Sequence, residues 1–213
     1  MDAGETVTNE TVEFWEARYA EKDQIWSGKV NPVMADLVGA LPAGRALDLG
    51  CGEGGDALWL AERGWTVTAV DVSQTALDRG AAQADALGLD GITWEQHDLT
   101  ATFPTGAFDL VSAQFFQSPI EFPRVALLRH AAELVAPGGV LLSVSHAAAP
   151  PWSNHHDHVF PTTDEELAEL ALDPEAWEVV QNGNVERAAS SPDGRHHGHL
   201  LDGVILVRRR PVD

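Results

Sequence analysis

The chain has 213 residues, 44% of them hydrophobic, which is ordinary for one globular domain with a full core. Its 33 Asp and Glu outnumber 13 Lys and Arg, and the formal net charge of −20 argues against binding to nucleic acid or to an anionic membrane. No apolar stretch approaches the about 18 residues that a membrane span needs.

The first residues and the cysteine content bear on location. The opening MDAGETVTNETVEF is acidic and lacks the basic and apolar regions of a secretory signal. Cys51 is the one cysteine, so neither an internal disulfide nor a cysteine-based zinc site is expected. These features predict a cytoplasmic protein. The one dense basic run, Arg208–Arg210, is interpreted as a solvated strand end rather than as a binding patch.

The N-terminal region Glu13–Asp36 is unusually rich in aromatic side chains, namely Phe14, Trp15, Tyr19 and Trp26. We interpret it as one or two helices that pack across the mouth of a sheet. Residues 1–37 are therefore predicted to form a helical lid, and residues 38–213 the main domain.

From residue 45 onward, short β-rich runs alternate with Ala- and Leu-rich helical runs, a pattern typical of a parallel sheet wrapped by helices. The predicted strands are Arg45–Leu49, Val67–Val70, Ile92–Gln96, Phe108–Ala113 and Val140–Val144. The predicted helices are Asp56–Arg63, Ala76–Leu87 and Arg124–Val135. Ser73 is the expected N-cap of the second helix, Gly88 its stop, and Pro137-Gly138-Gly139 the end of the third.

The character of the sequence changes after the fifth strand. The expected elements are an irregular loop at His146–Thr163, a helix at Asp164–Leu172, a strand from Trp177 to Val180 or onward to Glu186, a turn at Ser190–His199 and a strand at Leu201–Val207. The polar segment between the last two strands is too short for a crossover helix, so these strands are predicted to form an antiparallel hairpin. The expected fold class is α/β, with a mostly parallel sheet of seven strands, an antiparallel last strand and helices on both faces.

The segment Leu47-Asp48-Leu49-Gly50-Cys51-Gly52-Glu53-Gly54-Gly55 predicts a strand, a tight glycine turn and a helix. Glycines suit such a turn because the backbone bends sharply and a ligand approaches it closely. The G-x-G-x-x-G spacing alone is open to three interpretations: a methyl-donor site, a dinucleotide site or a purely structural turn.

Three aspartates lie near the ends of successive predicted strands: Asp48 inside the first, two places before Gly50, Asp71 at the close of the second and Asp98 after the third. Asp48 suits the ammonium group of a ligand that carries an amino acid. Asp71 suits two vicinal ribose hydroxyls, and Asp98 an adenine amino group. Each of them alone could be a helix cap or a solvated loop residue. Together they predict a nucleoside site at the carboxyl edge of the sheet, where open α/β sheets bind ligands.

Five segments together resemble the class I S-adenosylmethionine-dependent methyltransferases: Leu47-Asp48-Leu49-Gly50-Cys51-Gly52-Glu53-Gly54, Ala69-Val70-Asp71-Val72-Ser73, His97-Asp98-Leu99, Phe108-Asp109-Leu110-Val111 and Leu134-Val135-Ala136-Pro137-Gly138-Gly139. The resemblance covers about residues 40–145. It implies a Rossmann-like fold whose last strand is antiparallel, with S-adenosyl-L-methionine as cofactor.

At the N-terminus, Phe14-Trp15-x-x-Arg18-Tyr19, Trp26-Ser27-Gly28 and Asn31-Pro32 are similar to the tellurite-resistance and thiopurine methyltransferase branch, in which an N-terminal segment covers the cofactor. The expected cofactor-binding residues are Asp48, Gly50, Cys51, Gly52, Gly54, Asp71, Val72, Ser73, Asp98, Leu99 and Gln114, with Trp15, Tyr19 and Trp26 from the lid. The aromatic faces of the lid suit a sulfonium ion, although they equally suit the packing of a helix.

Methyl transfer from a sulfonium demands alignment and exclusion of water more than it demands catalytic side chains. Gln114 follows the fourth strand and His146 the fifth, and these two are the catalytic candidates. Most of the other histidines gather in two places: His155, His156 and His158, and His196, His197 and His199. Three interpretations of these histidines stay open: they lie in solvated loops, they contact the acceptor, or they bind a metal. No metal ligands are assigned.

The favoured function is methyl transfer to a small molecule, such as a thiol, heterocycle, hydroxyl compound or metalloid oxyanion. A nicotinamide-dependent oxidoreductase is one alternative, although it requires neither Asp48 nor Asp98 nor the final hairpin. A sensor that binds the cofactor without catalysis is another. Neither the acceptor nor the oligomeric state follows from the sequence, and no partner that is a nucleic acid or a membrane is expected.

Overall fold

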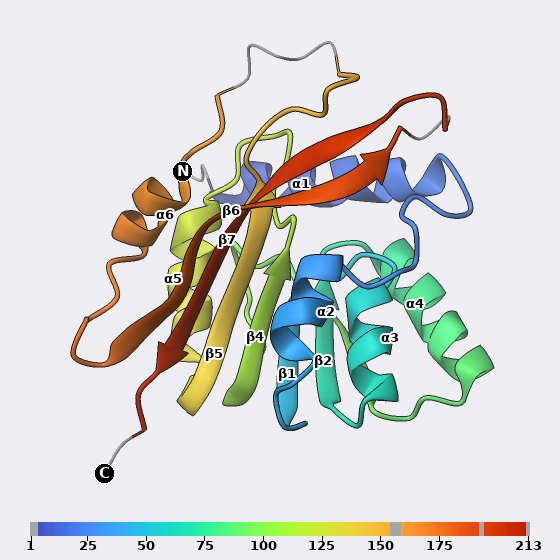
Figure 1. The fold of residues 1–213 in the computed structure, drawn as a ribbon. Coiled ribbons are helices and arrows are strands. Elements are labelled where there is room, and N and C mark those ends of the chain that lie inside the picture. Colours follow the sequence, from blue (N-terminus) through green and yellow to red (C-terminus); the bar gives the residue numbers. More distant parts are fainter. Residues whose placement is uncertain (1–3, 154–158, 192–193, 212–213) are drawn as a thin grey trace.

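The computed structural model describes residues 4–153, 159–191 and 194–211 and contains one seven-stranded sheet (Figure 1). The strands lie in the order β3-β2-β1-β4-β5-β7-β6, and only β7 runs antiparallel to its neighbours. Their bounds are β1 Arg45–Leu49, β2 Thr66–Asp71, β3 Ile92–Gln96, β4 Phe108–Gln114, β5 Val135–His146, β6 Trp177–Ser190 and β7 His197–Arg209. The predicted α/β class and the antiparallel final hairpin are confirmed.

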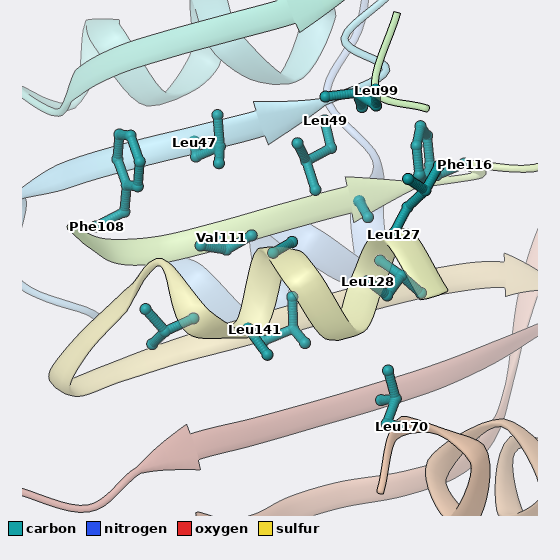
Figure 2. Close-up of a cluster of buried hydrophobic side chains, with 14 of the residues drawn as sticks. Leu47, Leu49, Leu99, Phe108, Val111, Phe116, Leu127, Leu128, Leu141 and Leu170 are labelled. Carbon is teal, nitrogen blue, oxygen red and sulfur yellow. The ribbon is translucent and has the colours of Figure 1, made fainter. Parts of the chain in front are cut away.

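Helices cover both faces of the sheet. They are α1 Gly4–Ala20, α2 Pro32–Val38, α3 Gly55–Glu62, α4 Gln74–Leu87, α5 Arg124–Glu133 and α6 Thr163–Leu170. Val33, Met34 and Leu60 of α2 and α3 pack into a cluster on one face. On the other face, Leu127 and Leu128 of α5 lie against side chains of β1, β4 and β5 (Figure 2). None of the helices described is long and apolar enough to cross a membrane.

The order of the strands brings the carboxyl ends of β1, β2 and β3 together, because these strands pair in parallel. Leu49 pairs with Val70, and Asp71 pairs with Gln96. The loops that follow these strands are also bonded to neighbouring strands, since Cys51 donates to Val70 O at 2.9 Å and His97 donates to Asp71 O at 3.0 Å. The glycine turn and the predicted acidic positions therefore share one edge of the sheet.

The predicted ends of α4 are confirmed. Ser73 caps the helix, because its hydroxyl accepts a hydrogen bond from Ala76 N at 3.2 Å. Gly88 ends it with a left-handed backbone, φ 69°. The N-terminal region Glu13–Asp36 contains parts of two helices, α1 and α2, as expected.

Several predicted boundaries were wrong, among them the end of α6, which lies at Leu170 and not at Leu172. The helix expected to run to Val135 ends at Glu133, and Val135 instead begins β5, where it pairs with Phe108. The final hairpin is longer than predicted, because β6 continues to Ser190 and β7 begins at His197. Beyond the pair His146–Asp202, β7 loses contact with β5, and the hairpin continues as a two-stranded ribbon away from the sheet (Figure 1).

Helix α6 begins with a reciprocal capping box, in which Glu165 N donates to the Thr162 hydroxyl at 3.2 Å and Thr162 N donates to the Glu165 carboxylate at 2.8 Å. We expect Thr162→Ala to lower the free energy of unfolding by about 1 kcal/mol and the Tm by about 2–4 °C. Thermal unfolding followed by circular dichroism checks this value. Thr105→Ala, in an exposed loop, serves as the control.

Candidate cofactor and acceptor sites

Three glycines of the turn after β1 have left-handed backbones: Gly50 has φ 64°, Gly52 has φ 54° and Gly54 has φ 81°. Other residues rarely adopt this conformation, because their Cβ atom collides with the backbone. The backbone conformation of this turn therefore requires the three glycines by which the sequence predicted it. The turn leads directly into α3, whose N-cap is Gly54.

Aromatic rings cover the turn closely. A Cβ atom added at Gly50 would lie 2.7 Å from the Phe116 ring, and one added at Gly52 would lie 2.9 Å from the Tyr19 hydroxyl. A Cβ atom added at Gly54 would lie 2.3 Å from Trp94. A larger residue at any of these positions would thus displace a wall of the site.

Carboxylates accumulate beneath the turn. Asp48 is 2% exposed, and its Oδ2 atom is buried without a hydrogen-bond partner. Burial raises the pKa of Asp48 well above its usual range, and the charges of Asp56 and Asp71 raise it further. Burial also raises the pKa of Asp56 to about 6. Such a group of carboxylates favours a ligand that brings positive charge.

Asp71, at the end of β2, is held in place by the backbone. It accepts hydrogen bonds from Gly52 N at 2.8 Å and Ser73 N at 3.0 Å, so it joins the glycine turn to the N-terminus of α4. Burial raises the pKa of Asp71 to about 6 despite these two donors. Val72, the next residue, is half-buried.

Asp98, after β3, has one engaged and one unpaired oxygen. Its Oδ1 atom accepts hydrogen bonds from the Thr100 amide at 2.9 Å and from the Thr100 hydroxyl at 2.6 Å. Its Oδ2 atom is buried without a partner. The adjacent Leu99 is 8% exposed and lies close to Phe116 at the carboxyl ends of the strands (Figure 2). The unpaired oxygens of Asp48 and Asp98 fit a ligand that donates hydrogen bonds at both ends of the site.

Tyr19 and Trp26 place the N-terminal segment over the turn. The Trp26 indole donates to the Tyr19 hydroxyl at 2.9 Å, and Tyr19 is 3% exposed. Burial and the charge of Asp71 raise the pKa of this phenol. Trp15 lies farther out, with its ring centroid 6.2 Å from that of Tyr19. Cys51, in the turn itself, is half-buried, and burial raises the pKa of its thiol well above the usual value.

The sequence did not reveal how this segment is fastened. Glu53 is 6% exposed and accepts hydrogen bonds from Ile25 N at 3.1 Å and Trp26 N at 2.9 Å. Arg79 of α4 donates to Glu53 at 2.9 Å and to Tyr19 O at 2.9 Å. Glu53 stood in the recognised motif as a variable position, and Arg79 belonged to no motif at all.

We expect Glu53→Ala to loosen this fastening, because two backbone amides and one guanidinium lose a shared charged acceptor. Hydrogen bonds to charged groups contribute about 1.5–3 kcal/mol, so amide exchange around Ile25 and Trp26 should accelerate about tenfold or more. Hydrogen–deuterium exchange of the native protein measures this. Glu21→Ala, which removes only an exposed pair with Arg18, is the matched control, and equal exchange in both variants would contradict the assignment.

Gln114 ends β4, and both ends of its amide are engaged. Its Oε1 atom accepts a hydrogen bond from Asn31 at 2.9 Å, and its Nε2 atom donates to Ser112 at 3.0 Å. Asn31 is also the N-cap of α2. Gln114 thus ties the N-terminal segment to the sheet, and its side chain is held in one orientation.

A cavity of about 490 Å³ opens beyond the carboxyl ends of β4 and β5. This volume is in the range of small-molecule sites. Its lining is largely apolar and consists of Gln117, Ser118, Pro119, Ile120, Phe122, Arg124, His146, Ala148, Ala149, Pro150, Ser153 and Phe160. The cavity therefore suits an apolar molecule with few polar groups.

His146 is the catalytic candidate that lines this cavity. Its ring stacks on Phe115, with centroids 4.3 Å apart, and its amide donates to Gln117 Oε1 at 2.9 Å. Phe115 has a left-handed backbone, φ 51°, which is rare for a bulky residue and turns its ring toward His146. Burial lowers the pKa of His146, so its ring is neutral near pH 7.

The other histidines do not join it. His197 and His199 line a separate hollow on the β6–β7 ribbon, together with Ala188, Ala189 and Gly198. His155, His156 and His158 lie outside the described residues. Within the described ranges, no three His, Cys, Asp or Glu side chains gather as a metal ion would require.

Comparison with known proteins agrees with this geometry. Residues 46–139 match the family model described as a methyltransferase domain. The chain is 33% identical over 160 residues to 2-heptyl-1-hydroxyquinolin-4(1H)-one methyltransferase of Mycobacteroides abscessus, covering 73% of this chain and 67% of that protein. It is 30% identical over 159 residues to thiocyanate methyltransferase 1 of Arabidopsis thaliana, covering 69% and 70%.

The fold is also that of a solved N-methyltransferase, NodS from Bradyrhizobium japonicum WM9, determined in complex with S-adenosyl-L-homocysteine. The two chains superpose with a TM-score of 0.67 at 19% identity, and the match covers 95% of this chain and 98% of NodS.

Proposed function

Because the chain belongs to the S-adenosylmethionine-dependent methyltransferase family, we propose that it methylates a small molecule bound in the cavity beside His146. The two curated relatives support this acceptor class, since one is named for a hydroxyquinolinone and the other for thiocyanate. The net charge of −20 disfavours nucleic acid as the acceptor. A cytoplasmic location and a lid formed by residues 1–37 over the domain 38–213 belong to the same proposal.

One observation carries the proposal for the cofactor: buried Asp48 and Asp98 keep unpaired oxygens on either side of Asp71. S-adenosylmethionine presents an ammonium group, a ribose and an adenine in that order, and its sulfonium supplies an activated methyl group. The proposed contacts come from Asp48, Gly50, Cys51, Gly52, Gly54, Asp71, Val72, Ser73, Asp98, Leu99, Gln114, Trp15, Tyr19 and Trp26. The positive charge of the ligand would offset the crowding of carboxylates beneath the turn.

Calorimetry tests the cofactor site. S-adenosylhomocysteine should bind, whereas NADH should give no heat of binding. The opposite pattern would replace the methyltransferase proposal with that of an oxidoreductase.

Labelled S-adenosylmethionine with a panel of thiols, phenols, N-heterocycles and metalloid oxyanions tests the transfer. We expect at least one of these small molecules to be methylated. Binding of the cofactor without product from any of them would instead indicate a sensor.

A further inference from the structure

A buried charged pair lies beside His146. Asp202 of β7 stands directly opposite His146 of β5 in an antiparallel pair, so both side chains lie on the same face of the sheet. Asp202 is fully buried, and its Oδ2 atom accepts a hydrogen bond from Arg187 Nε of β6. Its Oδ1 atom is buried without a partner. An unpaired carboxylate oxygen in the interior is costly unless a neighbouring donor uses it in some state of the protein.

The other neighbours that the structure describes around His146 offer it no proton donor or acceptor. The Phe115 ring stacks on the imidazole of His146. The side-chain oxygen of Gln117 accepts a hydrogen bond from the backbone N–H of His146. Arg187 also lies over the Phe115 ring, with its guanidinium carbon 5.4 Å from the centroid. The charges that act on the pKa of His146 are therefore Asp202, which raises it, and Arg187, which lowers it, while burial lowers it most.

The lining residues that the structure describes in the cavity beside this pair offer no free charge to an acceptor. Arg124 carries the only permanent charge among its lining residues in the described chain, and its guanidinium is engaged by Glu166 and, at 2.7 Å, by Ser143. Ile120, Phe122 and Phe160 add apolar surface. An acceptor that enters as an anion would lose its hydration without gaining a charged partner among these lining residues, so the lining favours the uncharged form of the acceptor.

We propose that His146, with Asp202 as its positioning residue, removes the proton from an uncharged acceptor that carries an ionisable O–H or S–H group on an apolar body. This inference rests on the proposed methyl transfer. A new bond forms between the acceptor oxygen or sulfur and the methyl carbon, while the bond from that carbon to the sulfonium breaks and its electron pair stays on the sulfur. The acceptor proton moves to a ring nitrogen of His146 and then to solvent.

This arrangement suits an acceptor that is protonated at neutral pH. His146 is neutral there and can accept a proton, and the Asp202 carboxylate stabilises the imidazolium that forms. The unpaired Asp202 Oδ1 atom gains a charged neighbour in that state. An acceptor that is already ionised in water would need neither group.

Two phenols of different acidity serve as probes, 4-ethylphenol as the weaker acid and 4-nitrophenol as the stronger, at pH 8. We expect His146→Gln to reduce kcat about 10²- to 10³-fold for 4-ethylphenol, with little change in KM. For 4-nitrophenol, whose bound uncharged form is the stronger acid and depends less on a base, the loss should stay below about tenfold. Added imidazole should restore part of the activity of His146→Ala toward 4-ethylphenol.

Asp202→Asn should reduce kcat for 4-ethylphenol about tenfold. It should also move the acidic limb of the kcat–pH profile to lower pH, because Asp202 then no longer opposes the lowering of the His146 pKa by Arg187. His130→Gln, on the surface of α5, is the control and should match the wild type. Equal losses for both phenols in His146→Gln, without imidazole rescue in His146→Ala, would overturn the proposal even if Asp202→Asn fails to fold.

Two further outcomes separate this inference from the proposed function. Binding of S-adenosylhomocysteine together with methylation of other acceptors, but of no phenol or thiophenol, would overturn the acceptor class and leave the methyltransferase proposal intact. Absence of S-adenosylhomocysteine binding would overturn both.

Discussion

Replacement of Asp71 by alanine is expected to weaken the binding of S-adenosylhomocysteine by about 1.5–3 kcal/mol, the range for hydrogen bonds to a charged group. The proposed contact of this carboxylate with the ribose comes in addition to the hydrogen bonds that it accepts from Gly52 N and Ser73 N, so we assign it two roles. The substitution also leaves these two amides without their acceptor. Isothermal titration calorimetry at pH 7.5 measures the change.

The pH dependence separates the two roles. Since the pKa of Asp71 is raised to about 6, its carboxylate becomes protonated below that pH, and the wild-type affinity should fall as pH decreases through about 6. Asp71→Ala should weaken this dependence but not abolish it, because Asp48 and Asp56 beneath the turn also have raised pKa values. Asp78→Ala, on the exposed side of α4, should bind like the wild type, and an affinity of Asp71→Ala within error of that control would contradict the placement of the ribose.

Replacement of Arg124 by methionine is expected to lower the free energy of unfolding by about 3–5 kcal/mol, because it leaves the buried carboxylate of Glu166 without a charged partner. Arg124 is 8% exposed and Glu166 5% exposed, and their contact joins α5 to α6. For a chain of this size the loss corresponds to a fall in Tm of about 6–20 °C. Chemical denaturation and differential scanning calorimetry both measure it.

The double variant Arg124→Met/Glu166→Leu tests the cause. If the loss reflects an unpaired buried charge, removal of both partners should recover most of the stability. Arg18→Met, which breaks an exposed pair with Glu21, should change stability by less than about 1 kcal/mol. A double variant as unstable as Arg124→Met would show instead that the arginine stabilises the fold by its packing.

The parts of the fold that the sequence predicted are those with local signals. Strands β1–β4 are short runs rich in β-branched, aromatic or other apolar residues, and α4 is bounded by a serine cap and a glycine stop. The final hairpin extends beyond its prediction because β6 and β7 pair mainly with each other there, and a two-stranded ribbon in solvent needs no alternation of apolar and polar residues. The Pro137-Gly138-Gly139 segment predicts a helix end but lies inside β5, where a shift in register relative to β4 accommodates it.

The residues of the candidate site likewise fall into those that the sequence identified and those that only the structure revealed. Asp48, Asp71 and Asp98 were identified because each lies in the last part of a strand or just after one, and the parallel pairing of those strands brings them to one edge. Glu53, Arg79, Arg187 and Asp202 could not be identified, since their roles depend on partners 15 to 60 residues away in the chain. Charged residues of this kind have the same local pattern as a solvated surface until the tertiary fold is known.

The outermost strand, β6, carries two adjacent apolar side chains in solvent, Val179 at 53% and Val180 at 42% exposure. An open strand with such a surface can recruit a strand from another molecule and so begin aggregation. The pairing of β6 with β7 shifts between Val179 and Gln181, which places an extra residue at this point and bends the backbone. The bulge interrupts the straight row of free amides and carbonyls to which a strand of another molecule would bond. It therefore disfavours the growth of fibres from the β6 edge of the sheet.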